Sequence, residues 1–238
     1  MTNSSHTTLC LDCAGRNLSL YFIKNQTVLA ELELDNVASQ AETLLPSIDK
    51  LLKKTKLDLE SIDSVLYSIG PGSFTGLRVG LATLQGLFVQ SQVRWQVLSS
   101  LLLRTLSAGE SDSRPVAAVV KLGRGRLALG VLGDLANEIV FEEERPLVGV
   151  KLADNKGYRQ GVVTETVFAD LLQEHEISKV LMSTALLDSH GDSWKKHSAL
   201  EADHHLKAGF VQALASESFQ KTQENHVVLD YFLKPNIG

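Results

Sequence analysis

The stretch Ser68-Ile-Gly-Pro-Gly-Ser-Phe-Thr-Gly-Leu-Arg-Val-Gly-Leu-Ala-Thr-Leu-Gln-Gly86 begins in an apolar run, passes through a tight turn and continues at helical spacing. The run 65–69 predicts a short strand. Gly70-Pro71-Gly72 predicts the turn that ends this strand, because glycine permits a positive φ or a close backbone approach and proline stiffens the chain. Ser73 or Thr75 is expected to cap a helix that runs to about residue 91.

The glycines of this stretch do not match the common phosphate-binding loops. They run G-x-G-x-x-x-G rather than G-x-G-x-x-G, and no Lys-Ser or Lys-Thr pair follows as in a P-loop. Gly76, Gly80 and Gly86 instead predict close packing of the helix, since a glycine inside a helix costs about 1 kcal/mol relative to alanine. The spacing leaves open whether that packing lies inside a domain or forms a subunit interface.

Both halves of the chain show three strand patterns, then a helix, a strand and a helix. In the first half we expect strands over 8–12, 18–23, 28–34, 65–69 and 93–98, and helices over 42–54, 74–91 and 101–106. In the second half we expect strands over 116–120, 127–132, 139–142, 179–182 and 227–232, and helices over 167–173 and about 195–219. The polar segment 109–115 is the best candidate for a linker.

This order predicts an α/β fold in which a mixed sheet flanked by helices occurs twice. It is the topology of ribonuclease-H-like domains and, in tandem, of the actin-like ATPase group (ASKHA). We therefore expect one domain over residues 1–106 and a second, degenerate copy over 107–238, with the last segment packing back on the first domain. A shift of 109 residues places Lys121 opposite Asp12.

Composition limits the function further. The chain has 238 residues, 44% of them hydrophobic, which suits a globular protein with a real core. Residues 1–106 carry nine basic and nine acidic side chains, and residues 107–238 carry fourteen and nineteen, so neither half has the basic excess of a nucleic-acid binder. No signal peptide or membrane span is apparent, and two cysteines give no disulfide framework. We expect a cytoplasmic protein.

The motif Gly70-Pro-Gly-Ser-Phe-Thr-Gly-Leu-Arg-Val-Gly-Leu-Ala82 resembles the hallmark of the TsaB/YeaZ family. The resemblance covers about residues 8–106 and includes Leu11-Asp12, Glu42-Thr-Leu-Leu-Pro46 and Val97-Leu-Ser-Ser-Leu101. It implies a non-catalytic, scaffold-like subunit of the complex that makes threonylcarbamoyladenosine at position 37 of tRNA. The implied partners are the TsaD transferase subunit and the TsaE ATPase, with tRNA contacted only through the complex.

The resemblance also implies which residues contact a partner, since the helix after the Gly-Pro-Gly turn and the helix over 42–54 form the dimer surface in this family. The corresponding positions here are Leu45, Ile48, Leu52, Pro71, Gly72, Ser73, Phe74, Thr75, Gly76, Leu77, Arg78, Val79, Gly80, Thr83 and Leu84. Asp12 and Gly15 would be a remnant nucleotide site. No cofactor is expected on this chain itself, because ATP and Mg²⁺ would be used by the partner subunits. A homodimer of the isolated chain stays open.

The sequence departs from the family pattern at several positions, which are Asp12-Cys-Ala14, Gln40-Ala-Glu42, Lys121-Leu-Gly-Arg-Gly-Arg126 and Phe232-Leu-Lys234. Two other functions of the same fold therefore stay as alternatives: an ATP-dependent phosphotransferase that uses Asp12, and a peptidase. Against the first, Asp12 is interpreted as a turn residue that accepts hydrogen bonds from nearby N–H groups. Against the second, the histidines lack the H-E-x-x-H spacing and Ser73 lacks a G-x-S-x-G elbow.

Three smaller patterns are interpreted structurally. Cys10 and Cys13 form a C-x-x-C, but in a strand their thiols point to opposite faces, so we expect two separate free thiols. The helical pattern over 195–219 places His197, His204 and His205 on an exposed face. The acidic run 142–144 is expected to be a solvated strand end.

Overall fold

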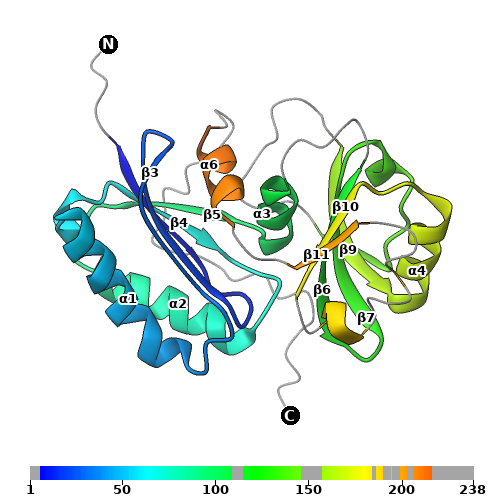
Figure 1. The fold of residues 1–238 in the computed structure, drawn as a ribbon, viewed down its shortest axis with the longest axis horizontal. Helices are drawn as coiled ribbons and strands as arrows, with labels where there is room; N and C mark the ends of the chain where they lie inside the picture. The colour runs from blue at the N-terminus through cyan, green and yellow to red at the C-terminus, as the bar shows by residue number, and fades with distance from the viewer. Residues whose placement is uncertain are drawn as a thin grey trace.

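The computed structural model describes residues 6–108, 115–145, 157–183, 186–189, 194, 199–202 and 206–215. Two mixed β-sheets, one from each half of the chain, stand next to each other with helices on their faces (Figure 1). No helix among the described residues is long and apolar enough to span a bilayer.

The first sheet has the strand order β3-β2-β1-β4-β5. Its strands are β1 (Thr7–Asp12), β2 (Leu18–Lys24), β3 (Thr27–Leu34), β4 (Ser64–Ser68) and β5 (Arg94–Leu98). Strands β1, β2 and β3 are antiparallel neighbours, whereas β4 and β5 run parallel to β1. Buried side chains fill β1, β2 and β4 almost completely, as expected for strands that are covered on both faces.

Three α-helices cover this sheet. α1 (Gln40–Thr55) and α2 (Phe74–Leu87) lie side by side on its outer face, and α3 (Ser100–Ser107) lies on the face toward the second sheet (Figure 1). Serine caps the start of each helix, with Ser39, Ser73 and Ser99 accepting hydrogen bonds from backbone N–H groups of the first turn. A short 3₁₀ turn, η1 (Leu59–Ser61), precedes β4.

The second sheet has the order β11-β10-β6-β7-β9-β8. Its strands are β6 (Val116–Gly123), β7 (Arg126–Leu132), β8 (Glu143–Arg145), β9 (Tyr158–Thr164), β10 (Lys179–Met182) and β11 (Ala199–Ala202). The connecting helices are η2 (Asp134–Asn137), α4 (Glu165–Glu174) and α6 (Lys207–Ala215). Apart from β8, strand order and directions repeat those of the first sheet. The predicted duplicated actin-like, ribonuclease-H-like fold is confirmed.

Two predicted elements of the second half are wrong. The third strand of its sheet is β9, not 139–142, because the chain makes the η2 turn and the short edge strand β8 before it pairs with β7. A continuous helix over 195–219 is excluded because β11 pairs with β10 inside that range and α6 begins at Lys207. The linker 109–114, the strand predicted over 227–232 and the three histidines lie outside the described residues.

Helix α3 is the element that the two sheets share. Leu102, Leu103 and Leu106 pack against the first sheet and against α6. Leu101 packs against Ala118, Ala128 and Val162 of the second sheet. Every residue of α3 from Ser100 to Leu106 is buried as a result.

Helix α6 belongs to the second half in sequence but lies on the first sheet. The rings of Phe210 and Tyr21 are 5.4 Å apart, and the Lys207 ammonium lies 2.7 Å from a carboxylate oxygen of Glu31. Gly209 lies so close to α3 that a Cβ there would overlap the backbone of Leu103.

The acidic run 142–144 extends from a loop into β8. Its three carboxylates lie within 3.1 Å of the guanidinium groups of Arg126, Arg145 and Arg159. These ion pairs balance the acidic charge at the β8 edge of the second sheet.

Candidate functional site

Hydrogen bonds connect the Gly70-Pro71-Gly72 turn and the residue after it to the start of α3 and to the segment just after β1. Gly70 has a φ of 106°, so the expected left-handed backbone is present. The Gly70 carbonyl accepts a hydrogen bond from the Ser100 N–H at 2.7 Å, and the Ser73 N–H donates to the Ala14 carbonyl at 2.5 Å. A Cβ on Gly72 would overlap Ala14, which is the close approach that the sequence predicts. The turn therefore holds the starts of α2 and α3 against β1.

Two of the N–H groups at the start of α2 have hydrogen-bond partners inside the chain. The Ser73 hydroxyl accepts a hydrogen bond from the Gly76 N–H at 3.1 Å, which confirms Ser73 rather than Thr75 as the cap. The Ser73 N–H is bonded to the Ala14 carbonyl as well, so two of the four N–H groups that open this helix are engaged inside the chain. Phe74 and Arg78 follow on the exposed side, with the guanidinium carbon 3.8 Å from the ring centre.

The inner face of α2 packs inside the domain. Gly76, Leu77, Gly80 and Leu84 are buried. A Cβ on Gly76 would overlap the Cys13 carbonyl, and one on Gly80 would overlap the Cys13 sulfur and lie 2.8 Å from the Tyr67 hydroxyl. The prediction that these four residues face a partner is corrected by their positions, because they have no surface to present. Ile48 of α1 and Pro71 of the turn are also buried, so the same correction applies to them.

Cys13 and Tyr67 form the floor under these glycines. The Cys13 thiol lies 3.2 Å from the Gly76 carbonyl, and the Tyr67 hydroxyl donates to the Leu77 carbonyl at 2.6 Å. Burial raises the pKa of the Cys13 thiol to about 12 and raises the pKa of Tyr67 well above its usual range. Cys10 is on the opposite face of β1, against α3, and both thiols are free, as predicted. Neither cysteine has the low pKa of a reactive thiolate.

The outer surface of the two helices is the remaining candidate. We define the α1/α2 face as Leu45 on α1 together with Val79, Ala82, Thr83 and Gly86 on α2. Leu45 is 51% exposed although it is a large apolar residue, Ala82 and Gly86 are exposed, and Val79 and Thr83 are half-buried. A Cβ on Gly86 would meet no atom within 4 Å. The face is therefore mostly apolar and lined by small side chains along α2.

The other residues predicted to contact a partner lie at the margin of this face. Gly72, Ser73, Phe74, Thr75 and Arg78 are exposed around the start of α2, and Leu52 is half-buried on α1. Ala82 and Gly86 are also exposed on this side of α2, although they are not among the partner contacts predicted from the sequence. Both follow Val79 at helical spacing, at three and seven residues.

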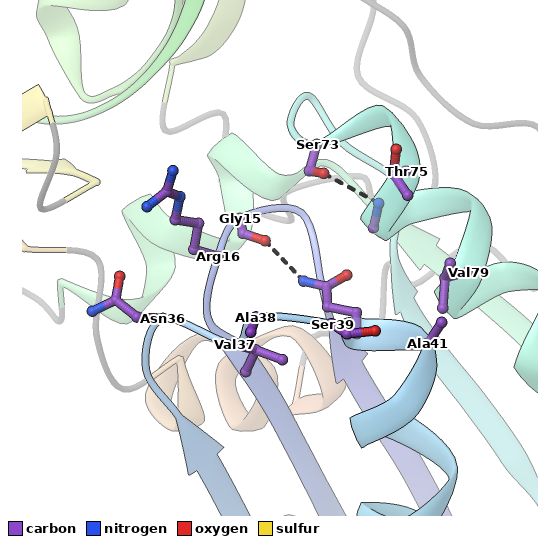
Figure 2. A pocket seen from close by; sticks show the side chains of 12 residues that line it. Gly15, Arg16, Asn36, Val37, Ala38, Ser39, Ala41, Ser73, Thr75 and Val79 are labelled. Atoms are coloured by element: carbon purple, nitrogen blue, oxygen red, sulfur yellow. Dashed lines mark hydrogen bonds between the residues drawn. The ribbon is translucent and has the colours of Figure 1, made fainter.

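A pocket of about 650 Å³ opens between the starts of α1 and α2. Figure 2 shows it bounded by the β1–β2 turn, the segment before α1 and the first turns of α2. The Gln40 amide bridges its floor by donating to the Gly15 carbonyl at 2.8 Å. Of the two residues of the predicted remnant nucleotide site, Gly15 lines this pocket and Asp12 does not.

Asp12, at the end of β1, forms an ion pair that the sequence did not predict. One of its carboxylate oxygens is 3.5 Å from the Arg104 guanidinium, and both side chains are almost fully enclosed. The interpretation of Asp12 as an acceptor for nearby N–H groups is therefore wrong. An arginine inside the leucine-rich run 101–106 was the available signal for a buried partner.

The fold group would place Mg²⁺ and a nucleotide near this acid, and the residues present do not fit them. Mg²⁺ needs accessible oxygen ligands and keeps several waters, whereas the Asp12 carboxylate is enclosed and already faces a cation. Its counterpart Lys121 is exposed, with its ammonium 3.6 Å from Glu165. Among the residues that the structure describes, no group of three or more His, Cys, Asp or Glu side chains could hold a metal ion.

The sequence of this chain is similar to those of known proteins. Residues 35–183 match the family model described as TsaD, tRNA N6-adenosine threonylcarbamoyltransferase. The chain is 29% identical over 113 residues to the tRNA threonylcarbamoyladenosine biosynthesis protein TsaB of Escherichia coli K12, covering 47% of this chain and 48% of that protein. It is 26% identical over 149 residues to the TsaB protein of Bacillus subtilis 168, covering 62% and 63%. The matched part of this chain spans about half the length of the curated relatives.

Two solved structures from Pseudomonas aeruginosa share the fold. One is described as an uncharacterized protein with similarity to peptidase YeaZ, with a TM-score of 0.63 and 18% identity over 94% of this chain and 100% of that one. The other is YeaZ itself, with a TM-score of 0.62 and 19% identity over 91% and 95%. The family model covers more than half of the chain, and the hallmark turn and helix are in place. The chain belongs to the TsaB/YeaZ family, within the wider family of TsaD-related proteins.

Proposed function

We propose that this chain is a non-catalytic subunit of the system that makes threonylcarbamoyladenosine at position 37 of tRNA. In this role it docks a TsaD-type transferase subunit through the α1/α2 face and supports recruitment of a TsaE-type ATPase. The E. coli and B. subtilis relatives carry the name of this biosynthetic pathway. The balanced charge of the first half suits a subunit that reaches tRNA only through its partners.

Gly86 is the observation that carries the docking part of the proposal. Gly76 and Gly80 offset their cost in helix stability by allowing close packing against Cys13 and Tyr67. Among the residues that the structure describes, Gly86 has no such neighbour, and it stands on the exposed side of the same helix. Small residues at 82, 83 and 86 let a second helix approach closely, and the exposed Leu45 supplies apolar area beside them.

Asp12 and Lys121 support a role without catalysis. The acid that an actin-like phosphotransferase would use is buried against Arg104, and a lysine replaces its counterpart in the second half. Both cysteines are enclosed thiols, and Ser73 is engaged as a helix cap. These arrangements offer no nucleophile or metal-binding acid to a substrate.

Reconstitution of tRNA modification tests the role. The TsaD-type and TsaE-type subunits of the same organism are incubated with tRNA and substrates, with and without this chain, and modified adenosine is measured by mass spectrometry of the nucleosides. We expect omission of this chain to lower the initial rate of modification at least about tenfold, which corresponds to about 1.4 kcal/mol in activation free energy. The full rate without the chain would contradict the proposal. ATP hydrolysis or peptide cleavage by the chain alone would favour the phosphotransferase or the peptidase instead.

A further inference from the structure

Asp12 and Arg104 are the two charged side chains that are buried among the described residues. Asp12 ends β1, and Arg104 lies in the middle of α3, the helix between the two sheets. Their exposed fractions are 2% and 3%, and the carboxylate oxygen Oδ2 is 3.5 Å from the guanidinium nitrogen Nη2. The pair therefore links the central strand of the first sheet to the helix that both sheets share.

Each of these charges depends on the other. An isolated charge in a protein interior is strongly unfavourable unless a partner of opposite sign or a metal ion compensates it. Arg104 is held in position independently, because its Nη1 donates to the Ser100 carbonyl at 3.0 Å. The second carboxylate oxygen of Asp12, Oδ1, is enclosed and has no hydrogen-bond partner. The guanidinium is thus the cation that compensates this carboxylate.

We infer that Arg104 is a built-in cation that takes the place of a divalent metal ion at Asp12. An always-charged guanidinium on a buried helix neutralises the acid permanently, so the end of β1 keeps its structure without metal or nucleotide. This inference goes beyond the proposed docking role and does not depend on it.

The test removes the built-in cation and asks whether a metal ion can replace it. In the full chain, Arg104→Ala opens space beside the carboxylate, and Asp12→Asn/Arg104→Ala has the same space without the charge. Thermal unfolding is followed with and without Mn²⁺ alone. We expect Mn²⁺ to leave the wild type unchanged within about 1 °C. Arg104→Ala should lose about 10 °C and regain at least about 3 °C with Mn²⁺, whereas the double variant should gain nothing.

Two results would overturn the inference. One is stabilisation of the wild type by Mn²⁺ that disappears in Asp12→Asn, since Asp12 would then bind metal despite Arg104. The other is a folded Arg104→Ala chain that Mn²⁺ does not stabilise. If Arg104→Ala is unfolded without metal, its refolding yield from urea is compared with and without Mn²⁺. Rescue that requires Asp12 supports the inference, and the lack of rescue contradicts it.

Discussion

Gly80→Arg is expected to leave no folded protein. The arginine side chain would start from a Cβ that overlaps the Cys13 sulfur and lies 2.8 Å from the Tyr67 hydroxyl. The Tyr67 side chain is held in place, because its hydroxyl donates a hydrogen bond to the Leu77 carbonyl of α2, the helix that also contains Gly80. Overpacking together with a buried unpaired charge costs more than about 5 kcal/mol, which is comparable with the whole stability of a typical domain. Circular dichroism and the soluble yield would record the loss.

The same substitution at Gly86 is the matched control, since both glycines belong to α2. Gly86 opens to solvent, so Gly86→Arg should fold with a melting temperature at or above that of the wild type. Alanine at the two positions gives a graded version: Gly80→Ala should lower the free energy of unfolding by about 2 kcal/mol, and Gly86→Ala should raise it by about 0.5–1 kcal/mol. Equal effects at both positions would contradict the assignment of the inner and outer sides of α2.

Gly86→Arg should in turn weaken binding to the TsaD-type subunit at least about 100-fold, equivalent to about 2.7 kcal/mol. Gly86 lies in the last turn of α2, and a long charged side chain there would hold α2 and a partner helix apart and leave its charge without water in the interface. The loss should appear mainly as faster dissociation. Isothermal calorimetry and surface plasmon resonance with purified subunits would measure the affinity and the dissociation rate.

Val167→Arg serves as the control for added charge. Val167 is 38% exposed on α4, in the second half and away from the α1/α2 face. It receives the same side chain in a helix, so a general effect of charge on association would weaken both variants equally. Loss of affinity in Val167→Arg alone, or wild-type affinity in Gly86→Arg, would place the docking surface elsewhere.

The first half of the fold could be predicted from sequence because its signals are local. A strand, a Gly-Pro-Gly turn and a capped helix succeed one another within the stretch 65–87, and each has its own residue pattern. The second half was harder because β9 owes its place to pairing with β7, a contact between residues about thirty positions apart. β11 likewise interrupts a pattern that is helical by spacing, since pairing with β10 outweighs local preference.

The candidate site could likewise be predicted only in part from local sequence patterns. Helical spacing grouped three glycines on α2, but only the packed structure shows that Gly76 and Gly80 face Cys13 whereas Gly86 faces solvent. The family motif likewise could not separate buried Ile48 and Leu84 from exposed Leu45. The Asp12–Arg104 pair joins residues from two elements that no short motif connects. Burial and long-range pairing decide these roles, and neither is encoded in a local pattern.

Hydrogen exchange of the chain, alone and mixed with the TsaD-type subunit, tests the docking claim most directly. We expect added protection to be concentrated in peptides from α1 (Gln40–Thr55) and α2 (Phe74–Leu87), with α4 (Glu165–Glu174) unchanged. Unchanged exchange of α1 and α2 in a mixture that forms a complex, or protection confined to the second sheet, would contradict it.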